Sequence, residues 1–425
     1  MTMKCVWMRM AAVGLAASLV AAGGCRHPGG DAPVPEARAP VAAVVTVYRH
    51  NSHADIIVSR LLLTHTLDGK GPESALKLAA LYTDQKPAGD TSRLLAASHR
   101  FPIFDRIGDT LTLGGDRLAV DGVLLIGEHG DYPRSATGNT QYPKRRFWDE
   151  TAAVFRRSGR VVPVFMDKHL ADNWADAKAI YDEAQALGVP LMAGSSVPLT
   201  WRKPAADVRC GAALEEIVVI TFGSTDHYGF HALEVAQALA EQRRGGETGI
   251  VSVQCLTNDQ VWAAMEAGAF GRDVFDAAWT RLPRHLNGAR PLREAVPNPV
   301  LFLLTHADGL RVAAIELNGA AGEWAGAWKY ASGGIESCEF WTQEARPGAH
   351  FTLLLNGIER MIVTGRLAWP VERTLMTSGA LDALLESRRQ GGARLATSNL
   401  AFAYRSDWRW REPPPPPPGR PWAEQ

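Results

Sequence analysis

The feature that most constrains the fold is a series of short apolar segments, each separated from the next by a stretch with helical spacing. The apolar segments of strand length are Val41–Tyr48, Leu76–Thr83, Val120–Ile126, Val161–Met166 and Pro190–Gly194. The helical stretches are His53–Leu63, Thr91–Arg100, Lys144–Arg157 and Trp174–Leu187. Apolar strands that alternate with helices indicate a parallel sheet covered on both faces. Because crossovers between parallel strands are right-handed, this half predicts a Rossmann-type, doubly wound sheet.

After Pro204 the pattern changes, and strand-like runs follow one another with fewer helices between them. These runs are Ile217–Phe222, Ile250–Cys255, Val300–Thr305, Leu310–Asn318 and Glu339–Gln343. The turn residues at 305–309 predict a hairpin between two of them. Met376–Arg389 is expected to be a helix, and Leu400–Tyr404 a final strand. The second half therefore predicts an α+β domain with an open, largely antiparallel sheet.

These patterns divide the chain into two expected domains with appendages. Its 425 residues are more than one compact core usually holds. We expect the Rossmann-type domain to span residues 41–204 and the C-terminal α/β open-sheet domain to span residues 205–405. Residues 406–425 include six consecutive prolines, Pro413–Pro418, and are expected to form an extended or disordered proline-rich tail.

The N-terminus has the composition of an export signal. An apolar run, Ala11–Ala22, follows positively charged residues and is too short to span a bilayer as a stable helix. It leads through small residues into Cys25, as in a bacterial lipoprotein cleavage box. We expect a signal peptide over residues 1–25, either lipidated at Cys25 or cleaved near it, and a flexible linker over residues 26–40. The expected location is the periplasm or cell envelope, with membrane contact only through such a lipid.

Charge and cysteine spacing exclude two classes of function. The 45 Lys and Arg residues balance the 45 Asp and Glu residues, and no basic cluster stands out. A nucleic-acid-binding protein needs a basic surface to neutralise phosphates, so we expect no nucleic-acid partner. None of the five cysteines is in a CxxC pair, which argues against a zinc site built from four cysteines.

Polar side chains follow the carboxyl ends of the predicted parallel strands, the edge at which doubly wound sheets bind ligands. The first strand is followed by Arg49–Asp55, which contains His50, Asn51, Ser52 and His53. A dinucleotide-binding turn needs glycines here, because they let the backbone approach the pyrophosphate at a helix N-terminus. This segment contains no glycine. The usual dinucleotide-phosphate loop is therefore missing.

Two later strand ends add carboxylates, histidines and a lysine. Glu128 and His129 follow the third long strand, and Asp167, Lys168 and His169 follow the next one. The alternative for each of these side chains is that it is a solvated loop residue. Because the carboxyl ends of parallel strands share one edge of a sheet, we expect the group to gather in one cleft.

The second half of the chain adds a further pair of histidines. His227, His231 and Glu234 are spaced to share one face if their segment is helical. The spacing of the two histidines is also compatible with a metal ligand pair, although no third ligand is evident. The alternative is a pair of core or interface histidines.

The order of the elements resembles the glucose-fructose oxidoreductase / inositol dehydrogenase / MocA family. The strongest match is Val161–Met192, in which Lys168 falls on the lysine of the family's Glu-Lys-Pro motif. Asp167 falls on the glutamate of that motif and His169 on its proline. Residues 227–231 lie where the family has Asp-x-Gly-x-His, so His231 matches the family's catalytic histidine and His227 replaces the aspartate. Residues 379–390 resemble the family's returning C-terminal helix, and the resemblance covers about residues 41–404.

The resemblance implies an oxidoreductase that acts on a sugar, polyol or related carbohydrate in a cleft between the domains. It implies NAD or NADP as cofactor, on the side of His50–His53, Glu128 and His129. Both of those loops depart from the family pattern, since they replace its Gly-x-Gly-x-x-Gly and Thr-Pro segments. Lys168 would assist proton transfer at a substrate hydroxyl and His231 would be the acid/base partner, with Asp167 and His227 beside them. A homo-oligomer through the C-terminal sheet is also expected.

Two other functions are compatible with the same residues. One is a non-redox lyase, epimerase or hydrolase that acts on a sugar derivative. Its metal or acid/base pocket would contain His50, His53, Glu128, His129, His227 and His231. Imidazole and carboxylate ligands suit a divalent metal such as zinc, manganese or iron. The other is a non-catalytic binding protein tethered at the cell envelope.

The export signal generates a testable prediction. Removing residues 1 to about 40 should leave the thermal unfolding temperature unchanged, because this segment is expected to add nothing to the core, and should abolish export. Thermal unfolding and cell fractionation of the two forms measure these effects. For the lipid, we expect Cys25→Ala to release the protein from the membrane fraction. Unchanged membrane association of that variant would contradict lipid attachment.

Overall fold

The computed structural model describes residues 37–419. The expected signal peptide, the lipid site at Cys25 and most of the expected linker lie outside the described residues. The predicted end of the linker was wrong, because Ala39 and Pro40 already belong to the first strand and Arg38 donates to the carbonyl of Leu76. Within residues 37–419, no helix combines the length and the apolar character that crossing a bilayer requires.

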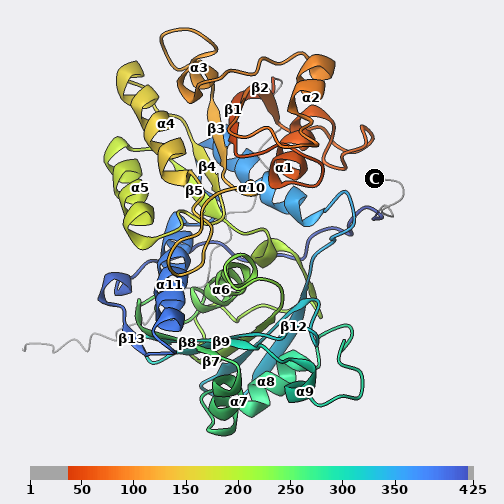
Figure 1. Ribbon diagram of the computed structural model, residues 1–425, viewed down its shortest axis with the longest axis vertical. Helices are drawn as coiled ribbons and strands as arrows, with labels where there is room; N and C mark the ends of the chain where they lie inside the picture. Colours follow the sequence, from red (N-terminus) through yellow and green to blue (C-terminus); the bar gives the residue numbers. More distant parts are fainter. Residues whose placement is uncertain (1–36, 420–425) are drawn as a thin grey trace, which may run out of the picture. The chain divides into compact units, whose positions relative to one another are not determined.

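The first half of the chain forms a five-stranded sheet in which every neighbouring pair is parallel. Its strands are β1 (Ala39–Val45), β2 (Leu76–Thr83), β3 (Gly122–Ile126), β4 (Val164–Asp167) and β5 (Leu191–Gly194). Their order across the sheet is β2-β1-β3-β4-β5. The apolar strands are buried because helices cover both faces, and the predicted Rossmann-type sheet is confirmed (Figure 1).

Helices from both ends of the chain cover this first sheet. One face carries α3 (Ile107–Thr112), α4 (Lys144–Ser158) and α5 (Trp174–Leu187). The other face carries α1 (His53–Leu62), α2 (Ser92–His99) and α10 (His350–Thr364). The sequence pattern did not predict α10, whose Leu355, Ile358 and Met361 are fully buried in the same apolar cluster as β1. A segment distant in sequence therefore completes the core of the parallel sheet.

The second half forms an eight-stranded sheet, mostly antiparallel, as predicted. Its strands are β6 (Trp201–Lys203), β7 (Leu214–Thr221), β8 (Ile250–Thr257), β9 (Val300–His306), β10 (Arg311–Glu316), β11 (Trp324–Tyr330), β12 (Ile335–Trp341) and β13 (Leu395–Ala396). Their order is β13-β8-β9-β10-β7-β11-β12-β6, with one parallel pair, β10 and β7. β9 and β10 form the predicted hairpin.

One predicted strand was wrong, and three strands were missed. Leu400–Tyr404 is not a strand, since a short 3-10 turn ends at Leu400 and Tyr404 makes only an isolated bridge to Glu247. β6 and β13 are too short to give a period-2 signal, and the small residues of β11 weaken its apolar pattern. All three missed strands are defined by pairing with strands that lie elsewhere in the sequence.

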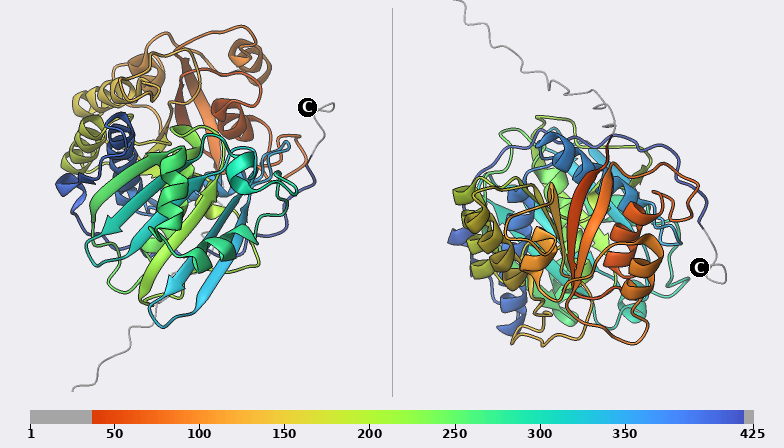
Figure 2. Two further views of the ribbon diagram at one scale, coloured as in Figure 1. Left: turned by 60° about the horizontal axis from the view of Figure 1, so that its bottom comes forward. Right: turned by 90° about the horizontal axis from the view of Figure 1, so that it is seen from above.

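Helices also cover both faces of the second sheet. On one face lie α6 (His227–Ala240) and α11 (Val371–Arg389). On the other lie α7 (Asp259–Glu266) and α8 (Arg272–Trp279), beside the short α9 (Leu292–Ala295), as Figure 2 shows. α11 also contacts β5 and α5, so it joins the two sheets.

The proline-rich segment is extended and packs against the edge of the second sheet. The indole of Trp201 in β6 donates to the carbonyl of Pro414 at 2.9 Å, and the indole of Trp410 donates to the carbonyl of Thr200 at 2.8 Å. The guanidinium of Arg202 lies 4.8 Å from the centre of the Trp410 ring. Of the two conformations left open by the sequence, the described part of the tail thus adopts the extended one.

Candidate active site

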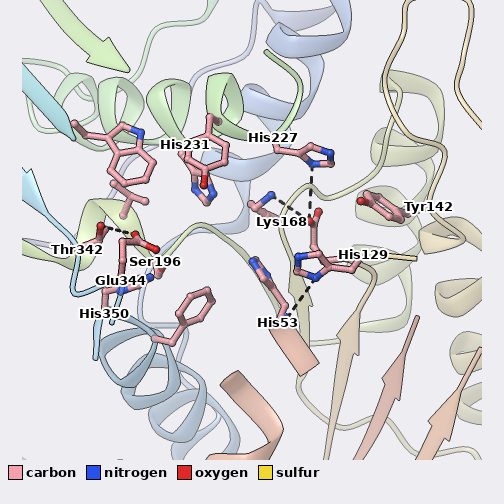
Figure 3. A pocket seen from close by; sticks show the side chains of 15 residues that line it. His53, His129, Tyr142, Lys168, Ser196, His227, His231, Thr342, Glu344 and His350 are labelled. Carbon is pink, nitrogen blue, oxygen red and sulfur yellow. Dashed lines mark hydrogen bonds and ion pairs between the residues drawn. The ribbon is translucent and has the colours of Figure 1, made fainter. Parts of the chain in front are cut away.

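A cavity of about 220 Å³ lies where the carboxyl ends of the first sheet face α6 and the segment after β12 (Figure 3). Its walls come from both halves of the chain, with lining residues between His53 and Phe351. The lining residues are His53, Glu128, His129, Tyr142, Lys168, Ser196, Val197, His227, Tyr228, His231, Trp324, Thr342, Glu344, His350 and Phe351. The side chains at the strand ends therefore lie in one cleft, as expected.

The centre of the cavity wall is an ion pair between Lys168 and Glu128. Nζ of Lys168 lies 3.3 Å from Oε2 of Glu128, and each side chain is only 3 % exposed. Burial alone would raise the pKa of Glu128, but the ammonium groups of Lys168 and Lys144 outweigh it and hold that pKa well below its usual range. Glu128 is therefore ionised, and the ammonium group of Lys168 balances its negative charge.

A second, fully buried lysine fixes the turn that carries Lys168. Nζ of Lys144 donates to the carbonyl oxygens of Asp167 and His169 at 3.1 Å each, and also to that of Lys168. Its side chain is 1 % exposed and lies 3.9 Å from Oε1 of Glu128. The peptide bond between Lys168 and His169 is cis. Three successive carbonyl groups are thus held by one ammonium group, which satisfies all three of its donors.

His53 and His129 form the side of the cavity next to β1 and β3. Nδ1 of His53 lies 2.6 Å from Oδ2 of Asp167, a hydrogen-bond distance that ties the start of α1 to the end of β4. The rings of His53 and His129 meet edge to face with centres 5.2 Å apart. Burial, aided by the nearby His53, lowers the pKa of His129 to about 4, so its imidazole is neutral near pH 7.

His227 and His231 lie in the first turns of α6, as their spacing predicts. Nδ1 of His227 is 3.9 Å from Oε2 of Glu128, whereas Nδ1 of His231 is 2.6 Å from Oγ of Ser195. Burial, and next the charge of Lys168, holds the pKa of His231 well below its usual range. Glu234 lies behind the cavity wall, where it accepts hydrogen bonds from Thr377 and from the backbone of Ser195.

The structure separates the predicted site residues into three groups. Lys168, His231, His227, His53, Glu128 and His129 line the cavity. Asp167 lies just behind it as the partner of His53. His50, Asn51 and Ser52 are not among the lining residues: His50 is exposed, 3.9 Å from the carboxylate of Asp55, and Ser52 caps α1.

Several lining residues were missed by sequence reasoning. They are Tyr142, Ser196, Val197, Tyr228, Trp324, Thr342, Glu344, His350 and Phe351. His350 and Phe351 begin α10, so a helical pattern recognised over residues 350–364 would have marked them as residues at the start of a helix. Trp324, Thr342 and Glu344 carry no comparable local signal, because only the pairing of β11 and β12 brings them here.

The turn where a Rossmann fold cradles a dinucleotide is filled by the chain itself. The carboxylate of Asp55, in the first turn of α1, accepts hydrogen bonds from the backbone N–H of Asn51 at 2.9 Å and from Ser59 at 2.7 Å. Arg346, from the segment after β12, donates to the same carboxylate at 2.8 Å. A pyrophosphate binds such a helix N-terminus through free N–H groups and positive potential. Here an internal carboxylate takes that place, so these residues do not fit a dinucleotide.

The metal alternative finds no support in the described part of the chain. Across residues 37–419, no group of three or more His, Cys, Asp or Glu side chains is arranged to hold a metal ion. His53 instead pairs with Asp167, His231 pairs with Ser195, and the ring of His129 packs against that of His53.

Solved structures of inositol dehydrogenases and of an NAD-bound protein from gentamicin A biosynthesis share this fold. GenD2 from gentamicin A biosynthesis, in complex with NAD, is 14 % identical with a TM-score of 0.55, over 87 % of this chain and 99 % of that one. A myo-inositol dehydrogenase from Corynebacterium glutamicum is 12 % identical with a TM-score of 0.51, over 84 % and 98 %. The myo-inositol dehydrogenase from Lactobacillus casei, in complex with NAD(H) and myo-inositol, is 10 % identical with a TM-score of 0.51, over 84 % and 96 %.

The class of fold is thus a parallel Rossmann-type sheet followed by an open, mostly antiparallel sheet, shared with inositol dehydrogenases. The fold implied by the resemblance in the sequence is therefore confirmed. No protein-family model and no curated protein sequence matches the chain.

The buried histidines of the cavity predict how stability depends on pH. Burial lowers the pKa of His350 to about 4, while in the unfolded chain a histidine titrates near 6.5. The unfolded chain thus binds the proton first, so the contribution of His350 is complete above about pH 6.5 and lost as the pH falls through 4. The loss is at most about 3.5 kcal/mol, at ~1.4 kcal/mol per pKa unit.

His350→Gln should therefore flatten the decline of unfolding free energy between pH 7 and pH 4, measured by urea denaturation. His99→Gln is the matched control, because His99 is exposed at the end of α2, and it should keep the original slope. Parallel curves for all three proteins would show that His350 is not the buried neutral group assumed here.

Proposed function

We propose that this protein is an enzyme that binds a small carbohydrate or polyol in the cavity and transfers a proton at its substrate. The observation that carries the proposal is the enclosed Lys168–Glu128 ion pair, 3.3 Å between Nζ and Oε2, at the strand ends of a sugar-dehydrogenase fold. Lys168 follows the end of a strand and lines a polar cavity, and loops that a rigid scaffold positions carry a large share of catalytic residues. Its placement supports a catalytic use.

Size and polarity support a small hydroxylated ligand. The cavity volume of about 220 Å³ is below the ~300–1,000 Å³ typical of sites for drug-sized molecules. Lys168, Glu344 and Thr342 offer donors and acceptors for hydroxyl groups. The rings of Tyr228 and Trp324 stack at 8° with centres 5.6 Å apart and give the wall an apolar part. A sugar ring presents the same combination of hydroxyl groups and apolar C–H surface.

The proposed chemistry is general acid–base catalysis. Lys168 exchanges a proton with an oxygen of the substrate, and the Glu128 carboxylate holds the ammonium form in place. Lys144 keeps the turn rigid, and neutral His231, which lies beside Lys168, offers a hydrogen bond to the substrate. A lyase, epimerase or isomerase needs no more than such proton transfers, whose contribution is typically about 10²–10⁴-fold in rate.

The second candidate is an oxidoreductase that acts on a sugar or polyol. It is favoured by the fold, since GenD2 and the Lactobacillus casei enzyme are both in complex with NAD or NAD(H). Against it stands the α1 turn, where Asp55 and Arg346 fill the place of the phosphates. The two candidates share Lys168 and His231 and differ in whether a dinucleotide binds.

Location and assembly enter as proposals that rest on the sequence. The leader composition supports export to the periplasm or cell envelope, with a lipid on Cys25 as the anchored form. The family resemblance supports a homo-oligomer formed through the second sheet.

Replacing Lys168 tests the proposed chemistry. The protein is incubated in D₂O, without added cofactor, with a panel of hexoses, pentoses, inositols and sugar acids, and loss of C–H proton signals is followed by NMR. We expect exchange or conversion of at least one compound, and Lys168→Met should slow it by about 10²-fold or more, because the proton-transfer group is gone. Lys178→Met removes an exposed lysine of α5 and should have no effect. Equal rates in both variants would rule out Lys168 as the acid–base group.

Titration with NAD, NADH, NADP and NADPH by calorimetry separates the two candidates. Because Asp55 is buried and bonded to Arg346, we expect no binding up to millimolar concentration. Micromolar binding of any of the four would move the assignment to the oxidoreductase.

A further inference from the structure

Ser195 connects the end of the first sheet to the cavity through His231. It directly follows β5 and is only 4 % exposed. Its Oγ lies 2.6 Å from Nδ1 of His231, which is a hydrogen-bond distance. The direction of this hydrogen bond decides which nitrogen of His231 carries the hydrogen.

The surroundings of Ser195 fix that direction. Its Oγ already accepts the backbone N–H of Val197 at 3.0 Å. Between residues 37 and 419, Nδ1 of His231 is the one acceptor that lies within reach of the hydroxyl hydrogen. A buried hydroxyl hydrogen without an acceptor is costly, so the hydroxyl donates to Nδ1. Since a neutral imidazole carries a single N–H group, that hydrogen then sits on Nε2.

We propose that Ser195 is a positioning residue that holds His231 in its Nε2–H form, so that the cavity presents a fixed hydrogen-bond donor to an oxygen of the substrate. Figure 3 shows His231 directed into the cavity from α6, with Lys168 beside it. Both residues thus offer donors on the same side of the cavity.

Glu234 holds Ser195 from behind. Its Oε2 accepts the backbone N–H of Ser195 at 3.2 Å, and its Oε1 accepts the hydroxyl of Thr377 at 2.6 Å. Glu234 is one turn after His231 in α6, so the same helix supplies the imidazole and the support of its partner. The approach requires Gly194, because a Cβ there would lie 2.6 Å from Oε2 of Glu234, and its φ is +129°.

The Nε2–H donor of His231 indicates which kind of sugar the cavity prefers. This step rests on the proposed function. Two donors, Nε2–H of His231 and the ammonium of Lys168, favour an oxygen on which negative charge develops during the reaction. A carbonyl oxygen becomes such a centre when the Glu344 carboxylate, which also lines the cavity, takes a proton from the neighbouring carbon. The preferred substrate is therefore a sugar with a free aldehyde or ketone group, rather than an inositol or a glycoside.

NMR of protein labelled with ¹⁵N-histidine tests the hydrogen position directly. The signals of His231 are assigned by their loss in His231→Gln. We expect the unaltered full-length protein and Ser195→Thr, which keeps the hydroxyl, to show the Nε2–H form. Ser195→Ala should give a mixture of the two neutral forms, and Ser98→Ala, an exposed serine of α2, should match the unaltered protein. An Nδ1–H form in the unaltered protein, or no change in Ser195→Ala, would overturn the proposal.

Turnover of the NMR panel separates this inference from the proposed function. Ser195→Ala should lower kcat by about tenfold with a smaller change in KM, because a donor to developing charge acts mainly in the transition state. Ser195→Thr should restore most of the rate, and thermal unfolding checks that both variants are folded. If the hydrogen position changes as expected but no panel sugar reacts in any form, the positioning role stands and the proposed reaction fails. If carbonyl sugars react no faster than inositols, the substrate class is wrong.

Discussion

The ammonium group of Lys144 is the contact on which the rest of the site depends. It reaches from α4 under the end of β4 and binds the carbonyl oxygens of residues 167–169. The side chains of those residues point in three directions: Asp167 to His53, Lys168 to Glu128, and His169 to the backbone of Asp226 at the start of α6. A buried ammonium is tolerated only when all its donors are satisfied and an opposite charge is near, and Glu128 supplies that charge. One lysine thus aligns groups from both sheets.

Fold and chemistry are separable in this molecule. The two-sheet architecture is that of dehydrogenases that bind NAD, yet the first turn of α1 holds the Asp55 carboxylate with Arg346 over it. Asp55 comes from the same turn, whereas Arg346 comes from a segment almost three hundred positions later. The backbone N–H groups of Asn51 and Asp55 are bonded within the turn itself, to the side chains of Asp55 and Ser52. A shared fold therefore does not by itself fix the cofactor or the reaction.

The sequence predicted the parts of the fold that rest on local pattern. The five parallel strands, α5 and the β9–β10 hairpin all followed from apolar periodicity and turn residues. Lys168, Glu128 and His231 could be named because strand ends and helix starts gather side chains predictably. Trp324, Thr342 and Glu344 could not, since β11 is rich in small residues and only its pairing with β7 and β12 defines it. The absence of glycine from residues 49–55 was visible in the sequence. The ion pair between Asp55 and Arg346 in this turn was not, because Arg346 is distant in sequence.

The extended tail has a consequence for solubility. β6 is the last strand of its sheet, and a free sheet edge with unpaired backbone groups is a template for aggregation. Prolines cannot extend a sheet, because they lack the N–H group that a further strand would need. Trp410 and Pro414 pack against β6 and cover this edge of the second sheet. A further strand cannot pair with the proline segment that covers it. A segment whose composition looks dispensable is thus placed to keep copies of the protein apart at this edge.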